Sequence, residues 1–85
     1  MNAVAAAVDK AANHGWIAPP DVQDFQHRID DLSHSLATGK TDDIAHKIDD
    51  FEHHLDDLAQ KGHMKAAAYK QIVHALEGFR SVVGA

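Results

Sequence analysis

The stretch that decides the fold is IDDFEHHLDDL, residues 48–58, in which four apolar side chains are separated by seven ionisable ones. Its apolar residues follow a spacing of three, four and three, which places all of them on one face of an α-helix. The four aspartates, one glutamate and two histidines occupy the other faces. The stretch therefore predicts an amphipathic helix with one face in a core and the other faces in solvent.

The same spacing recurs along the chain and predicts three more helices. One runs from about residue 21 to residue 37, and one lies near the end of the sequence, where its apolar stripe extends from Tyr69 to Val83. The third is alanine-rich and covers about residues 3–13. The apolar stripes of the four helices are Val4, Val8 and Ala11; Val22, Phe25, Ile29, Leu32 and Leu36; Ile44, Ile48, Phe51, Leu55 and Leu58; and Tyr69, Ile72, Leu76, Phe79 and Val83.

Glycines separate the predicted helices. Gly15, Gly39 and Gly62 each follow a periodic segment, where a glycine can adopt the left-handed conformation that ends a helix. Ile17 is placed to pack back on the helix that has just ended. We expect Thr41 to be the N-cap of the third helix. Because the connections are short, neighbouring helices must be antiparallel.

The chain also contains an internal repeat. A shift of 47 residues pairs Val4 with Phe51, Val8 with Leu55, Asp9 with Asp56, Ala12 with Ala59, Gly15 with Gly62, Ile17 with Met64, Phe25 with Ile72, His27 with His74, and Ile29 with Leu76. Each unit is helix, Gly-x-apolar turn, helix, and cannot bury its stripe alone. We predict an all-α, antiparallel four-helix bundle made of two repeated helical hairpins, one domain over residues 1–85, with repeats at about 1–38 and 41–85.

Composition excludes several classes of function. The 13 acidic and eight basic residues give a net charge of −5, which repels nucleic acid and anionic lipid. With no cysteine, the chain has neither a disulfide framework nor a thiolate zinc site. No apolar run approaches the roughly 20 residues that span a bilayer. We therefore expect no nucleic-acid binding and no membrane insertion of this segment.

Catalytic motifs are absent as well. The serines and threonines fall on predicted helix surfaces or loops, without a Gly-x-Ser-x-Gly elbow or a glycine-rich phosphate loop. A small compact bundle also offers little cleft in which the pKa of a carboxyl group could be shifted for acid–base chemistry. We predict that the chain is not an enzyme and requires no cofactor.

The histidines and aspartates of the third helix suggest a metal site only on the surface. The heptad phase set by its apolar stripe points them outward, whereas di-iron bundles use inward-facing Glu-x-x-His motifs, of which this sequence has none. Histidine and aspartate one helical turn apart can hold Zn²⁺, Cu²⁺ or Ni²⁺ loosely. The candidate ligands are His46, Asp50, His53 and His54.

Two residues in equivalent turns are candidates for partner binding. Trp16 lies in the first interhelix turn, and His63 occupies the matching position in the second. The indole either caps the end of the bundle or is exposed to a partner or a sugar ring. If the chain binds a partner, we expect the contact at the end carrying Trp16 and His63 or along a groove between helices.

The turns NHGWI and QKGHM, each followed by a helix with FQHRIDDL or IVHALEGF, resemble a family of duplicated helical-hairpin modules that includes the FIMAH domains. Such modules occur at the C-termini of actinobacterial extracellular enzymes and in extracytoplasmic regions of receptor-type Ser/Thr kinases. The resemblance implies an appended, non-catalytic module outside the membrane. This chain departs from the expected pattern by having Ala18 and Lys65 where a polar N-cap is expected.

These observations lead to one principal functional hypothesis and two alternatives. The principal one is a non-enzymatic interaction or sensor module of a larger bacterial extracytoplasmic protein, for example a receptor Ser/Thr kinase, that binds a protein or a cell-envelope ligand. The first alternative is a histidine-rich module that responds to pH or metal, since protonation of all eight histidines would change the net charge from −5 to +3. The second is a structural spacer or a homodimerisation unit.

Overall fold

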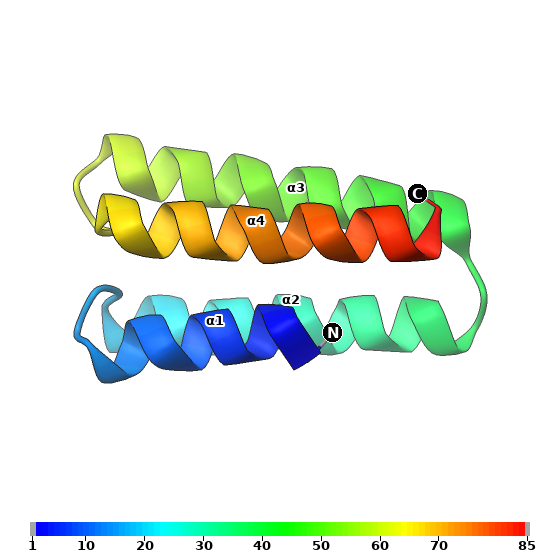
Figure 1. The fold of residues 1–85 in the computed structure, drawn as a ribbon, viewed down its shortest axis with the longest axis horizontal. Coiled ribbons are helices and arrows are strands. Elements are labelled where there is room, and N and C mark those ends of the chain that lie inside the picture. The colour runs from blue at the N-terminus through cyan, green and yellow to red at the C-terminus, as the bar shows by residue number, and fades with distance from the viewer. Residues whose placement is uncertain (1, 85) are drawn as a thin grey trace.

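The computed structural model describes residues 2–84, and the outermost residues of the two predicted repeats, 1 and 85, lie outside that range. The described chain forms four α-helices and contains no named strand: α1 (Asn2–Asn13), α2 (Pro19–Ala37), α3 (Thr41–Gln60) and α4 (Ala66–Val83). The α1–α2 and α3–α4 turns lie at one end, and the α2–α3 connection lies at the other (Figure 1). The prediction of an all-α bundle is confirmed.

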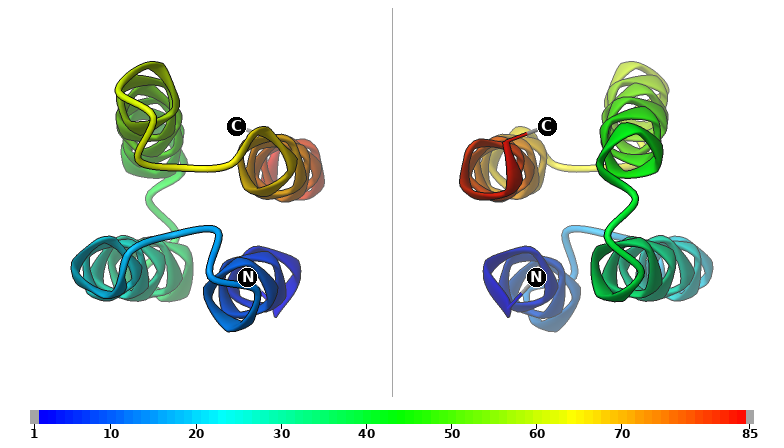
Figure 2. Two further views of the ribbon diagram at one scale, coloured as in Figure 1. Left: turned by 90° about the vertical axis from the view of Figure 1, so that its left-hand side faces the viewer. Right: turned by 90° about the vertical axis from the view of Figure 1, so that its right-hand side faces the viewer.

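The helices occupy the four corners of a square when viewed along the bundle (Figure 2). α1 packs against α2 and α4, and α3 packs against α2 and α4, so that within the described chain the backbones approach closely between adjacent helices and not across the diagonals. Each hairpin therefore covers the apolar face of the other hairpin. This arrangement explains why the repeated unit is present twice.

The core is built from the predicted stripes. The largest fully buried side chains include Phe25 and Phe51, whose rings stack with centroids 5.4 Å apart between α2 and α3. The weak stripe of α1 is also confirmed, because Val4, Val8 and Ala11 are all fully buried. At the edge of the core, Trp16, Val22, Tyr69 and Val83 are partly buried against it.

One predicted core position is wrong. Leu36 is 44% exposed, whereas its neighbour Ser35 is 1% exposed. α1 has 12 residues and α2 has 19, so the last two turns or so of α2 have no α1 beside them. Ser35 faces α3, where its hydroxyl donates a hydrogen bond to Asp43 Oδ2 (2.8 Å) and accepts one from Lys47 Nζ (2.8 Å). The apolar spacing did not reveal this difference between Leu36 and Ser35.

The predicted start of α3 is also corrected. Lys40 is its N-cap and Thr41 is the first helical residue, and no side chain caps this end. The backbone N–H of Thr41 donates to Gly39 O (3.2 Å) in a tight turn, which draws Thr41 into the helix. Asp42 and Asp43 lie in the first turn, where the positive end of the helix dipole favours carboxylates.

The internal repeat is reproduced in the backbone. Gly15 and Gly62 end α1 and α3 with φ angles of 71° and 74°. Two positions after these glycines stand Ile17 and Met64. Both are buried, and they form an isolated antiparallel bridge with one another. The two equivalent turns are therefore joined side by side at one end of the bundle, which we call the turn end.

Candidate functional site

A pocket of about 450 Å³ lies at the turn end. Both predicted partner-binding residues, Trp16 and His63, line it. The rest of its wall comes from the same two turns and the residues flanking them: Ala12, Gly15, Ile17, Ala18, Pro19, Gly62, Met64 and Lys65. Residues separated by 47 positions in the sequence are thus brought together because the hairpins pair through their turns.

The backbone holds Trp16 firmly in place. Its N–H donates to Ala11 O (2.9 Å), and its carbonyl accepts a hydrogen bond from the N–H of Lys65 (3.2 Å) in the opposite turn. The indole is partly buried against the core and stacks on the ring of His14, with centroids 4.5 Å apart and planes 16° apart. The side chain is therefore half-buried at the end of the bundle, and Trp16 is also one of the residues that line the pocket.

The charge of the pocket is opposite to that of the chain. Lys65 and His63 line it, and none of its lining residues is acidic. The whole chain carries a net charge of −5. An anionic group is therefore more favourable at this pocket than beside the acidic residues that outnumber the basic ones in the chain, and the partly buried Trp16 provides contact area for an apolar group.

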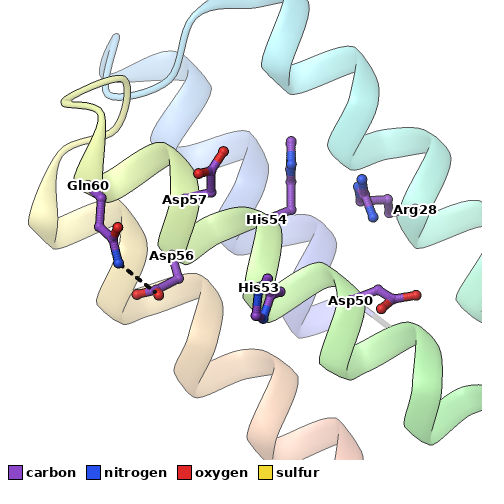
Figure 3. A pocket seen from close by; sticks show the side chains of 7 residues that line it. All are labelled: Arg28, Asp50, His53, His54, Asp56, Asp57 and Gln60. Atoms are coloured by element: carbon purple, nitrogen blue, oxygen red, sulfur yellow. Dashed lines mark hydrogen bonds between the residues drawn. The ribbon is translucent and has the colours of Figure 1, made fainter.

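A second, acidic hollow of about 500 Å³ lies along α3. Its lining includes three of the four candidate metal ligands, Asp50, His53 and His54, whereas His46 lies outside it. Figure 3 shows that these side chains fan out around the helix and do not converge on one point. Within residues 2–84 no group of three or more histidine, aspartate or glutamate side chains is placed to hold a metal ion.

His54 differs from the other histidines of α3. Its side chain is only 28% exposed, and its Nε2 lies 2.9 Å from Asp24 Oδ2 of α2. The two atoms are close but not aligned as a hydrogen bond, so Nε2 has no hydrogen-bonding partner among residues 2–84. The ring also meets Phe25 edge-on, with centroids 5.7 Å apart. The inference that every histidine of this helix faces solvent is thus wrong for His54, because its heptad position borders α2.

A polar cluster between α3 and α4 was not anticipated from the sequence. Arg80 Nη2 donates to Asp49 Oδ1 (2.6 Å) and Glu52 Oε1 (3.3 Å), and its Nε donates to Glu77 Oε2 (2.9 Å). Burial raises the pKa of Glu52, and so does the neighbouring carboxyl group of Glu77, whereas Arg80 acts against this rise. The cluster joins two helices around one guanidinium and does not enclose a cavity, so we interpret it as a structural contact.

The first turns of α3 hold a smaller polar contact. The hydrogen bond from Ser35, followed by the contact with Lys47, lowers the pKa of Asp43 below its ordinary value of 3.8. Asp43 and Lys47 also approach to 3.3 Å as an ion pair one helical turn apart. These contacts connect the beginning of α3 to the end of α2.

The geometry defines a class of protein: a duplicated helical-hairpin module whose surface features are a turn-end pocket and a charged outer face. The sequence model of the FIMAH domain family matches residues 1–81, so the chain belongs to this family. That family is a small helical module of larger proteins and not a family of catalytic domains. Neither the curated proteins nor the solved structures contain a match to the chain. Within the described range, no helix is both long enough and apolar enough to cross a bilayer.

Proposed function

We propose that the chain is a non-enzymatic interaction module that binds a protein partner through the pocket at the turn end. The observation that carries the proposal is the junction of the two turns, which places Trp16 next to Lys65 and His63. Aromatic residues are enriched at protein interfaces, where a few such residues contribute most of the binding energy. The partner presents an apolar side chain next to a carboxylate.

We extend the proposal to the parent protein. The module is the extracytoplasmic part of a larger secreted or membrane-anchored bacterial protein, such as a receptor Ser/Thr kinase. The occurrence of similar helical-hairpin modules in such proteins supports this location. Binding at the turn end suits an appended module, because the two turns that line the pocket lie at the end of the bundle opposite to the C-terminus of α4 (Figure 1).

The test begins with a selection of phage-displayed peptides on the immobilised protein, followed by titration of the enriched peptides. We expect these peptides to carry an apolar residue next to Asp or Glu and to change the fluorescence of Trp16, the chain's single tryptophan. Lys65→Glu should weaken their binding by about tenfold or more, since an attractive charge becomes a repulsive one.

Lys70→Glu is the matched control. It makes the same charge change at an exposed site of α4 that does not line the pocket, and it should alter affinity by less than about threefold. Peptides without acidic residues, or peptides that bind the Lys65→Glu and Lys70→Glu variants equally well, would contradict the proposal. Binding of soluble cell-wall glycan in place of peptides would assign the pocket to a cell-envelope ligand.

A further inference from the structure

The connection between α2 and α3 departs from helical geometry at two residues. Thr38, which follows α2, is still right-handed, with φ and ψ of −91° and −3°. Gly39 has a φ of 72°, and Lys40, the N-cap of α3, has φ and ψ of −88° and 79°. The next residue already begins α3. A change in the backbone of Gly39 and Lys40 would therefore join α2 and α3 into one continuous helix.

The other two connections cannot be straightened in this way. The connection from α1 to α2 leads into Pro19 and Pro20, and a proline inside a helix lacks the N–H group and clashes with the preceding turn. Residues 61–65 separate α3 from α4, and among them Met64 takes part in the antiparallel bridge at the turn end. The shorter connection from α2 to α3, residues 38–40, contains neither obstacle.

The start of α3 has backbone donors that a continuous helix would satisfy. The N–H of Thr41 donates to Gly39 O (3.2 Å) across a tight turn, and within residues 2–84 no backbone carbonyl accepts the N–H of Asp42 or Asp43. In a continuous helix these three N–H groups would donate to the carbonyls four residues earlier, at residues 37–39. The straight form thus gains regular hydrogen bonds, whereas the bent form needs a left-handed residue.

Straightening separates the two hairpins of one chain, but a second copy can replace each of them. The hairpins pack through the α1–α4 and α2–α3 contacts, and every copy carries the same complementary faces. Ser35 and Asp43 lie four positions before and after Gly39. When two straight helices lie antiparallel about Gly39, Ser35 of one copy therefore comes beside Asp43 of the other. The contacts between hairpins are thus restored between copies.

We propose that two copies of this chain exchange hairpins about Gly39 and form a dimer of two four-helix bundles joined end to end. The second copy contributes to the turn-end pocket, because Trp16 of one copy then lines it together with His63 and Lys65 of the other. The two pockets lie at the far ends of the dimer, since the turns are opposite to the α2–α3 connection (Figure 1). At low concentration the bent form predominates, because its closure is intramolecular.

Gly39→Ala tests the hinge. Alanine is strained at a φ of +72° and favours the continuous helix, and a Cβ atom at this position would meet nothing within 4 Å. Because both copies carry the substitution, the association constant of the dimer should rise by about a hundredfold or more. Gel filtration with light scattering, after refolding at about 10 µM to about 1 mM, measures this change. The helical circular dichroism should be retained in the dimer.

Gly15→Ala is the matched control. It introduces the same strain, since Gly15 has a φ of +71° and a Cβ atom there would also meet nothing within 4 Å. Pro19 and Pro20 nevertheless prevent α1 and α2 from merging into one helix. This variant should lose stability but remain monomeric over the same range of concentrations.

A cysteine pair distinguishes exchanged hairpins from two closed copies side by side. Ile17 and Met64 oppose one another in the antiparallel bridge, a spacing that suits a disulfide, and the chain has no cysteine of its own. Ile17→Cys with Met64→Cys should therefore give a disulfide between chains in the Gly39→Ala dimer and one within the chain in the closed monomer. Non-reducing electrophoresis separates the two products.

A second measurement covers the case in which the cysteine variant does not fold. The rings of Phe25 and Phe51 stack between the two hairpins, so a dimer of one isotope-labelled and one unlabelled copy should show this contact between chains by NMR.

Three outcomes would overturn the proposal. They are a Gly39→Ala variant that is monomeric at about 1 mM, a Gly15→Ala variant that dimerises to the same extent, and a dimer in which the disulfide and the Phe25–Phe51 contact stay within one chain. None of these measurements depends on peptide binding, so the exchange of hairpins and the function proposed above can fail separately.

Discussion

At the scale of single residues, the charge of Glu52 opposes the fold. One of its carboxylate oxygens accepts a hydrogen bond from Arg80 (3.3 Å), while the other is buried without a hydrogen-bonding partner among residues 2–84. Burial and the neighbouring Glu77 raise the pKa of Glu52 above its ordinary value of 4.5. Replacing the carboxylate with a neutral amide should therefore favour the folded state at neutral pH.

We predict that Glu52→Gln raises the thermal midpoint by about 2 °C at pH 7. Because the pKa is raised in the folded state, the unfolded chain ionises first as the pH increases, and the wild type loses stability as the pH rises through the folded-state pKa. Below the ordinary value of 4.5 both states are protonated, so the difference should disappear there. Thermal melts at pH 3.5 to 7.5 measure this, with the exposed Asp30→Asn as control. A difference that does not increase with pH would contradict the prediction.

At the scale of an element, the end of α3 depends on a backbone conformation that only glycine adopts readily. Gly62 has a φ of +74°, whereas Gly78 lies inside α4 with ordinary helical geometry. Gly62→Ala should destabilise the protein by about 1 kcal/mol, because a Cβ atom is strained in the left-handed region. Gly78→Ala should stabilise it by about 0.5–1 kcal/mol, because alanine favours the helix. Chemical denaturation of both variants measures these values, and a loss of stability in Gly78→Ala would refute the second one.

The two repeats differ in the backbone donors that are free for capping at the starts of α2 and α4. Ala18 and Lys65 are the N-caps of α2 and α4, with nearly identical extended backbones and no side-chain cap bond. Pro19 and Pro20 follow Ala18, and the N–H of Asp21 already donates to Ala18 O (3.0 Å). Few free donors therefore remain for a new cap on α2, whereas Ala66, Ala67 and Ala68 at the start of α4 retain theirs.

We predict that Lys65→Ser stabilises the protein by about 1 kcal/mol, because serine can accept a hydrogen bond from the open first turn of α4. Ala18→Ser should gain less than half as much, since prolines remove the donors it would need. Urea denaturation of the two variants gives the comparison. Equal gains would show that the prolines do not limit capping of α2.

At the scale of the whole molecule, each hairpin buries the apolar stripes of the other. α1 packs on α4 and α2 packs on α3, so a single hairpin would leave its stripe in water. We predict that peptides of residues 1–38 and 41–85 are largely unfolded when separate and recover helical circular dichroism when mixed. A fragment of residues 41–85 that is fully helical as a monomer would contradict this interdependence.

Local patterns predicted most of the architecture. The stripes of α2, α3 and α4, the glycine turns and the 47-residue repeat all follow from positions close together in the sequence, where helical periodicity and backbone preferences act. Side-chain neighbours across the bundle were harder to predict. Leu36 and Ser35 are adjacent on α2, and the contacts of Ser35 with Asp43 and Lys47 of α3 bury the polar residue while Leu36 is left exposed. His54 was predicted at the surface, yet the rotation of α3 against α2 brings it to Asp24.

The candidate site also has features that the sequence predicted and features that depend on tertiary packing. The sequence singled out Trp16 and His63 because equivalent turns carried different side chains, and it determined the helices, the repeat and the polarity of each face through local periodicity. Only the tertiary structure decided that these residues share one pocket with Lys65 and that Arg80 joins Asp49 to Glu77. Those contacts depend on how far each helix extends beside its neighbours and how it is rotated, which is set by packing between residues far apart in the chain.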